Sequence, residues 1–154
     1  MLVILGIDHV GLATNDAAGA GVFLTALGMR RTESGVAGDY GVACDFWECP
    51  AAGEHPVGHC PTEAASRHPA IEMVSPIRDD SSITERLAQN SGGLYHIAFR
   101  VDDIQAEIAR LRDSGFVAID SRPHPGARRG MQVAFMYAKK PACLVVELVQ
   151  YQEG

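Results

Sequence analysis

The sequence predicts an α+β fold of two tandem βαβββ modules, each a strand, a helix and three further strands. The segments that begin at His9 and His96 carry an aspartate seven positions after the histidine and a glycine 19 positions after it. Apolar residues alternate before each aspartate and follow helical spacing after it. Each half ends in a strand with a glutamate inside an apolar run. A duplicated module explains all three observations.

The first half opens with a strand in "MLVILGIDHVGLA", which has no basic flank and is too short to span a membrane. Asn15 or Asp16 is expected to cap the next helix, which carries an apolar stripe and ends at Gly28. Strands are expected in "GMRRTES", "YGVACDFWECP" and "AIEMVSP". Residues 50–69, rich in Pro, Gly, Ala and His, read as a long loop between the last two.

The second half repeats this order after a short helix, which the capping pattern of Ser82 and Glu85 predicts. In "HIAFRV" every second residue from His96 lies on one strand face, and the apolar residues lie on the other. Asp102 or Asp103 is expected to cap the helix that ends at Gly115. Strands follow in "FVAIDSR", "GMQVAFMYA" and "CLVVELVQY". We expect one domain over residues 1–154, with module one at about 1–77 and module two at about 92–152.

Composition limits the class of protein. The chain has 154 residues and a formal net charge of −6, which argues against nucleic acid as a partner. Its four cysteines include no C-x-x-C pair, and a chain of this length needs no disulfide framework. We expect a cytoplasmic protein that binds a small molecule, with no membrane partner.

Four residues at repeat-equivalent positions form the candidate site: His9, Glu72, His96 and Glu147. Each half supplies one imidazole and one carboxylate from a strand interior. A carboxylate is costly to bury there unless it is paired or bound to a metal. The set suits one divalent cation, for which Co, Zn, Mn, Ni, Mg and Fe(II) are candidates. A structural histidine or an edge glutamate would explain each residue singly, but the repeated pairs favour a metal site between the halves.

The stretches "IDHVGLATND", "IEMVSPIRDDSSITERLAQNSGGLYHIAFRVDDI" and "VVELVQY" resemble the vicinal oxygen chelate superfamily, which includes glyoxalase I, extradiol dioxygenases and bleomycin-resistance proteins. Within it they are most similar to the methylmalonyl-CoA epimerases. The resemblance implies a U-shaped cleft around a divalent metal, with His9, Glu72, His96 and Glu147 as ligands. The sequence departs from the epimerase pattern at Tyr95 and Tyr137, where epimerases usually carry histidine, and in the longer loop of residues 50–69.

The resemblance also implies an activity: an epimerase or isomerase that moves a proton next to a thioester carbonyl through a metal-bound enolate, with an acyl-CoA as the possible substrate. Asp45 is a candidate proton-transfer residue, and an ordinary polar role on a half-buried strand is equally compatible with it. Glu48 is the alternative, on the opposite strand face. Glu147 is expected to double as ligand and base.

Three alternatives stay open from the sequence. The first is an enzyme of the superfamily with another reaction, such as a glyoxalase-type lyase or a thiol transferase. A dioxygenase normally has two histidines and one carboxylate, so the second glutamate argues against it. A drug-binding resistance protein often lacks the ligands. A homodimer is also expected, both from the resemblance and because Val145 and Val149 would leave an outer sheet face apolar.

Overall fold

A computed structural model of the chain describes residues 4–50, 68–90 and 92–152. The predicted loop of residues 50–69 lies almost entirely outside them. The first module contains strand β1 (Ile4–Ala13), helix α1 (Ala17–Ala26) and strands β2 (Arg30–Ala37), β3 (Val42–Glu48) and β4 (Ala70–Pro76). A 3-10 turn, η1 (Gly38–Tyr40), joins β2 to β3. The order of elements is the predicted one.

The second module repeats this order after helix α2 (Thr84–Asn90). It contains β5 (Gly93–Val101), helix α3 (Ile104–Asp113), two short strands β6 (Val117–Ala118) and β7 (His124–Pro125), then β8 (Met131–Ala138) and β9 (Leu144–Tyr151). The prediction of a full strand over "FVAIDSR" is wrong. The side chain of Asp120 accepts the backbone N–H of Phe135, so it takes the place of a backbone partner and pairing ends after two residues.

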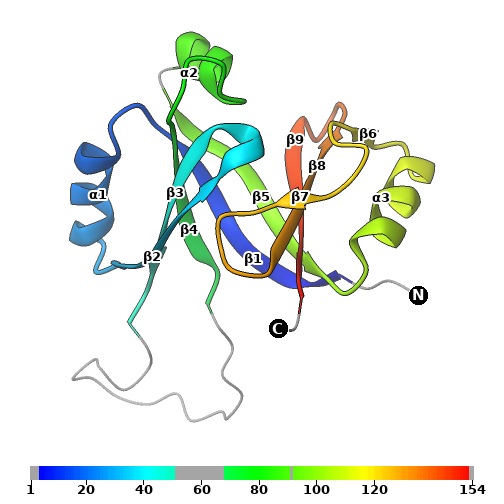
Figure 1. Ribbon diagram of the computed structural model, residues 1–154, viewed down its shortest axis with the longest axis horizontal. Helices are drawn as coiled ribbons and strands as arrows, with labels where there is room; N and C mark the ends of the chain where they lie inside the picture. The colour runs from blue at the N-terminus through cyan, green and yellow to red at the C-terminus, as the bar shows by residue number, and fades with distance from the viewer. Residues whose placement is uncertain (1–3, 51–67, 91, 153–154) are drawn as a thin grey trace.

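One sheet passes through both modules, in the strand order β2-β3-β4-β1-β5-β9-β8-β6. Strands β1 and β5 pair antiparallel at its centre, while β1–β4 and β5–β9 pair in parallel within the modules. Figure 1 shows α1 and α3 at opposite sides of the molecule, each beside the strands of its own module. The predicted tandem arrangement is therefore confirmed, and the four central strands are those that carry the candidate site.

The helices begin where the sequence places a capping aspartate. Asp16 Oδ1 accepts the N–H of Gly19 at 2.8 Å, and Asp103 Oδ1 accepts the N–H of Ala106 at 3.0 Å. α3 buries its apolar stripe, including Ile104, Ile108 and Leu111, against β8 and β9. α1 buries Leu24 over Met73, but much of its apolar surface remains exposed. Among the described residues, no helix combines the length and the apolar composition needed to cross a membrane.

Candidate metal centre

Two rows of the central sheet place the four side chains together. In one row Gly11 of β1 lies between Glu72 of β4 and His96 of β5. In the next row Ala98 of β5 lies between His9 of β1 and Glu147 of β9. Gly11 and Ala98 are repeat equivalents, each two residues after a histidine. Each row therefore holds one histidine and one glutamate on either side of a small residue.

The small residues make room for the rings. A Cβ atom on Gly11 would lie 2.2 Å from Cε1 and 2.3 Å from Nδ1 of His96, so the imidazole lies directly over the Gly11 backbone. Ala98 is fully buried under the second row. This explains why β1 has a glycine at the position that pairs with His96 of β5.

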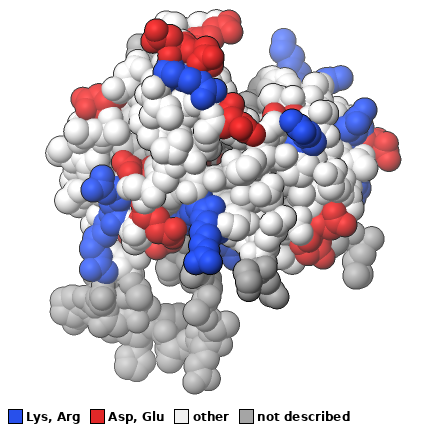
Figure 2. Space-filling model, viewed as in Figure 1, with Lys and Arg blue, Asp and Glu red and all other residues white. Residues whose placement is uncertain are grey.

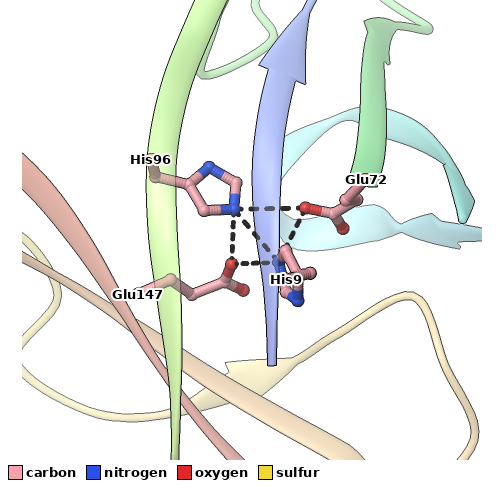
Figure 3. A group of neighbouring side chains, drawn as sticks. All are labelled: His9, Glu72, His96 and Glu147. Carbon is pink, nitrogen blue, oxygen red and sulfur yellow. Dashed lines mark hydrogen bonds and ion pairs between the residues drawn. The ribbon is translucent and has the colours of Figure 1, made fainter. Parts of the chain in front are cut away.

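The ligand atoms of the four residues converge in a buried space (Figure 3). All four side chains are at least 94% buried, and one nitrogen or oxygen from each lies within 4.8 Å of the others. The Nε2 atoms of His9 and His96 are 3.1 Å apart. Glu147 Oε2 lies 2.9 Å from His9 Nε2 and 2.7 Å from His96 Nε2. Glu72 Oε2 lies 3.0 and 3.2 Å from the same two atoms.

This donor set fits a divalent cation. Two imidazole nitrogens and two carboxylate oxygens point at one volume. Without a cation between them, two glutamates are buried close together, which is costly. Four protein ligands leave positions open for a chelating substrate on a six-coordinate ion. The residues present are therefore able to hold the ion that the sequence predicts.

The electrostatics of the group follow from its burial and its mixed charge. Burial lowers the pKa of His9, but the carboxylates of Glu72, Glu147 and Asp8 outweigh it and raise that pKa well above 6.5. Burial also lowers the pKa of His96, but the carboxylates of Glu147 and Glu72 outweigh it and raise that pKa. Burial raises the pKa of Glu72, yet the two imidazoles hold it far below its usual range. Without a cation, the site is thus stabilised by protons on its histidines.

Asp8 belongs to this site, although the sequence analysis did not identify it. Strand alternation would turn Asp8 to the face opposite His9. A register irregularity between Ile7 and His9 changes that direction, and Asp8 Oδ2 accepts a hydrogen bond from His9 Nδ1 at 2.8 Å. Burial alone would raise the pKa of Asp8, but the bonds from His9 and Arg100 lower it to about 2. The signal that could have identified Asp8 is its place in the sequence, directly before a candidate ligand histidine.

A cleft opens beside Glu72, His96 and Glu147. Its lining is mainly apolar, with side chains such as Val42, Val133 and Phe135, and its volume including the open mouth is about 350 Å³. Polar groups at its wall come from Tyr40, Cys44, Ser82 and Tyr95. The cleft thus places an apolar wall with a few polar groups directly beside the converging side chains.

The structure does not bring Asp45 to this cleft. On β3, Phe46 pairs with Glu72 and shares its face, whereas Asp45 pairs with Met73, which packs under α1. Asp45 instead lies in a hollow beside α1, where it accepts a hydrogen bond from Ser34 Oγ at 2.5 Å and pairs with Arg31 at 3.7 Å. Glu48 has the same strand parity as Phe46, and Arg128 Nη2 lies 3.4 Å from it.

The sequence profile of the glyoxalase/bleomycin resistance protein/dioxygenase superfamily matches residues 8–135. An ethylmalonyl-CoA/methylmalonyl-CoA epimerase from Cereibacter sphaeroides is 29% identical over 94% of this chain and 96% of that protein. A mitochondrial methylmalonyl-CoA epimerase from Dictyostelium discoideum is 38% identical over 79 residues, and the match spans only 47% of its length.

Solved structures give the same fold. Methylmalonyl-CoA epimerase from Mycobacterium tuberculosis superposes with a TM-score of 0.78 at 24% identity, over 99% of this chain and 94% of that one. A methylmalonyl-CoA epimerase in complex with methylmalonyl-CoA and ammonium gives 0.77 at 25% identity, over 97% and 96%.

Proposed function

Because the chain belongs to the glyoxalase/bleomycin resistance protein/dioxygenase superfamily, we propose that it is a metal-dependent epimerase of the methylmalonyl-CoA epimerase type. The observation that carries this proposal is the buried group of His9, Glu72, His96 and Glu147 beside a small apolar cleft. A relative similar over nearly the whole chain, the Cereibacter epimerase, supports the substrate class: a malonyl thioester with a short 2-alkyl group.

Each residue has a role that its position supports. The four side chains would hold one divalent cation, which supplies Lewis-acid stabilisation to the oxyanion of a deprotonated thioester. Glu147 lies at the cleft and is our candidate for the group that removes the α-proton. The apolar walls of the cleft would contact the alkyl group and keep water away from it.

Solvent-deuterium exchange on methylmalonyl-CoA tests the proposal, with ethylmalonyl-CoA as a second substrate. The metal-loaded protein should catalyse the incorporation of deuterium into the substrate, at the carbon between its two carbonyl groups. Glu147→Gln should abolish exchange, while Glu85→Gln on the exposed surface of α2 serves as a matched control and should leave it unchanged. Absence of exchange in the metal-loaded wild-type protein on both substrates would reject the epimerase and favour another reaction of the superfamily.

We also propose a homodimer, although the residues first expected to drive it do not. Val149 is fully buried in the core, and Val145 is half-buried. Support comes instead from α1 and its C-cap, where Val22, Phe23 and Leu27 are 66–75% exposed. Sedimentation velocity at micromolar concentration should give twice the monomer mass.

The surface charge suits a small-molecule ligand rather than nucleic acid. Figure 2 shows Lys and Arg side chains dispersed among acidic ones on the face drawn there, rather than in one basic patch of the kind that binds nucleic acid. The cytoplasmic location stays a prediction.

A further inference from the structure

The carboxylate of Asp8 is the centre of a buried network behind His9. Besides His9, Asp8 contacts Arg100, whose Nη2 lies 2.5 Å from Oδ1, and Tyr151, whose hydroxyl lies 3.2 Å from Oδ2. Arg128 Nη1 is 3.7 Å from the same oxygen. Asp8 is only 5% exposed, so these groups balance a charge that would otherwise be costly to bury. The network therefore fixes the position of the carboxylate.

The two hydrogen-bond partners of Asp8 other than His9 come from the strands that carry the histidine and glutamate of the other module. Arg100 lies on β5 four residues after His96, and Tyr151 lies on β9 four residues after Glu147. Spacings of four keep each pair on one strand face. Module two thus contributes His96 and Glu147 to the group. It also holds Asp8 in place, and Asp8 contacts His9 of module one.

The sequence provides no equivalent network behind His96 of module two. At the repeat-equivalent positions, Tyr95 replaces Asp8, Ala13 (13 = 100 − 87) replaces Arg100, and Pro76 (76 = 151 − 75) replaces Tyr151. Ala13 and Pro76 have no side-chain hydrogen-bond donor. The Tyr95 ring packs edge-on against the His96 ring at a centroid distance of 4.7 Å. In the described part of the chain, His96 Nδ1 is buried without a hydrogen-bond partner.

We propose that Asp8 is a positioning residue for the metal centre and that this support is built for only one of its two histidines. Asp8 holds the proton of His9 on Nδ1, so the Nε2 lone pair faces the cation site, and it fixes the ring rotation. His96 is held by packing over Gly11 instead. This inference rests on the metal centre of the proposed function, but not on the identity of the substrate.

A pair of repeat-equivalent variants tests it. Asp8→Ala should raise the dissociation constant for Co(II) by about 10–100-fold, the usual effect of removing a partner behind a ligand histidine. Tyr95→Phe, the matched control in the other module, should leave that constant unchanged. Titration of metal-free protein followed by the visible absorption of Co(II) gives both constants without any activity assay. Equal effects of the two variants, or an unchanged constant in a folded Asp8→Ala protein, would overturn the proposal.

Two milder variants keep the test decisive if Asp8→Ala does not fold. Asp8→Asn retains an acceptor oxygen without the charge, and Tyr151→Phe removes one donor to Asp8; both should weaken Co(II) binding less than Asp8→Ala. In the zinc-loaded wild type, NMR of ¹⁵N-labelled histidines should show a strongly downfield Nδ1 proton for His9 alone, which disappears in Asp8→Asn. A comparable proton on His96, or its persistence on His9 in the variant, would contradict the assignment. A wild type that binds Co(II) but exchanges no substrate proton would reject the epimerase and leave this inference standing.

Discussion

At the scale of single residues, the smallest side chains of the sheet decide where the largest polar ones lie. Gly11 and Ala98 carry no functional group, yet each separates a histidine from a glutamate in its row. A glycine in a strand interior normally weakens the strand. Here it permits the His96 imidazole to lie against the backbone, so the loss of strand stability has a local structural reason.

Substituting this glycine should therefore affect the metal more than the fold. In Gly11→Ala the new methyl group overlaps the His96 ring, which has to rotate away from the other three ligands. We expect metal affinity to fall on the order of tenfold or more, as when the orientation of a ligand is lost. Gly38→Ala is the matched control, because a Cβ there meets nothing within 4 Å. Retained affinity in Gly11→Ala, measured by competition with a chelating dye, would show that the ring is not held there.

The histidines also predict how stability depends on pH. In the metal-free protein the pKa of His9 lies well above 6.5, its value in the unfolded chain. Such a group contributes stability that is fully present below pH 6.5 and is lost as the pH rises through the folded-state pKa. The free energy of unfolding in a chelator should thus decrease from pH 6.5 upward. Metal affinity should increase over the same range, because the cation displaces fewer protons. Denaturant titrations with and without Co(II) would measure both trends.

At the scale of helices and strands, periodicity predicts most elements but not which face of a strand lines the cleft. Alternation correctly separates Asp45 from Glu48, yet it cannot tell which of them faces the ligands. That choice is made by the pairing of β3 with β4, which aligns Phe46 with Glu72. Asp8 escaped prediction for a related reason, since the register irregularity in β1 depends on its partner strand. Both failures arise from pairing between strands, whereas the converging group of His9, Glu72, His96 and Glu147 was predictable because the repeat marks each type of residue twice.

The capping aspartates allow the two helices to be compared directly. Asp16→Ala and Asp103→Ala should each lower the free energy of unfolding by about 1 kcal/mol, the usual contribution of an N-cap side chain. Asn15→Ala and Asp102→Ala, at the neighbouring positions, are the controls and should change it little. Metal affinity should be unaffected in all four, because neither helix carries a ligand. Urea unfolding of each variant checks the first expectation, and an effect of the controls as large as that of the caps would contradict it.

At the scale of the whole molecule, the central strands join the two modules into one sheet. β1 and β5 belong to different modules and pair along most of their lengths. A chain built this way is expected to unfold in one transition rather than module by module. This supports our proposal of a single domain, with module one at about residues 1–77 and module two at about 92–152.

Metal removal gives the sharpest test of that unity. A cation bound only by the folded chain adds about 4 kcal/mol of stability when its free concentration is about 1,000 times the dissociation constant. Adding a chelator should therefore lower the melting temperature while the protein still melts in one transition, as monitored by calorimetry. Two separate transitions, only one of them sensitive to metal, would show that the modules are independent.

The separation of the ligands along the chain has a kinetic consequence. His9 contacts Glu147 across 138 positions and His96 across 87. Contacts of such long range form late, because much of the chain has to be ordered before they can close. A newly made polypeptide would be unable to capture its cation until β9 had joined the sheet. Stopped-flow refolding in the presence of Co(II) should therefore show the visible absorption band growing no earlier than the last folding phase. The appearance of this band would then mark the end of folding.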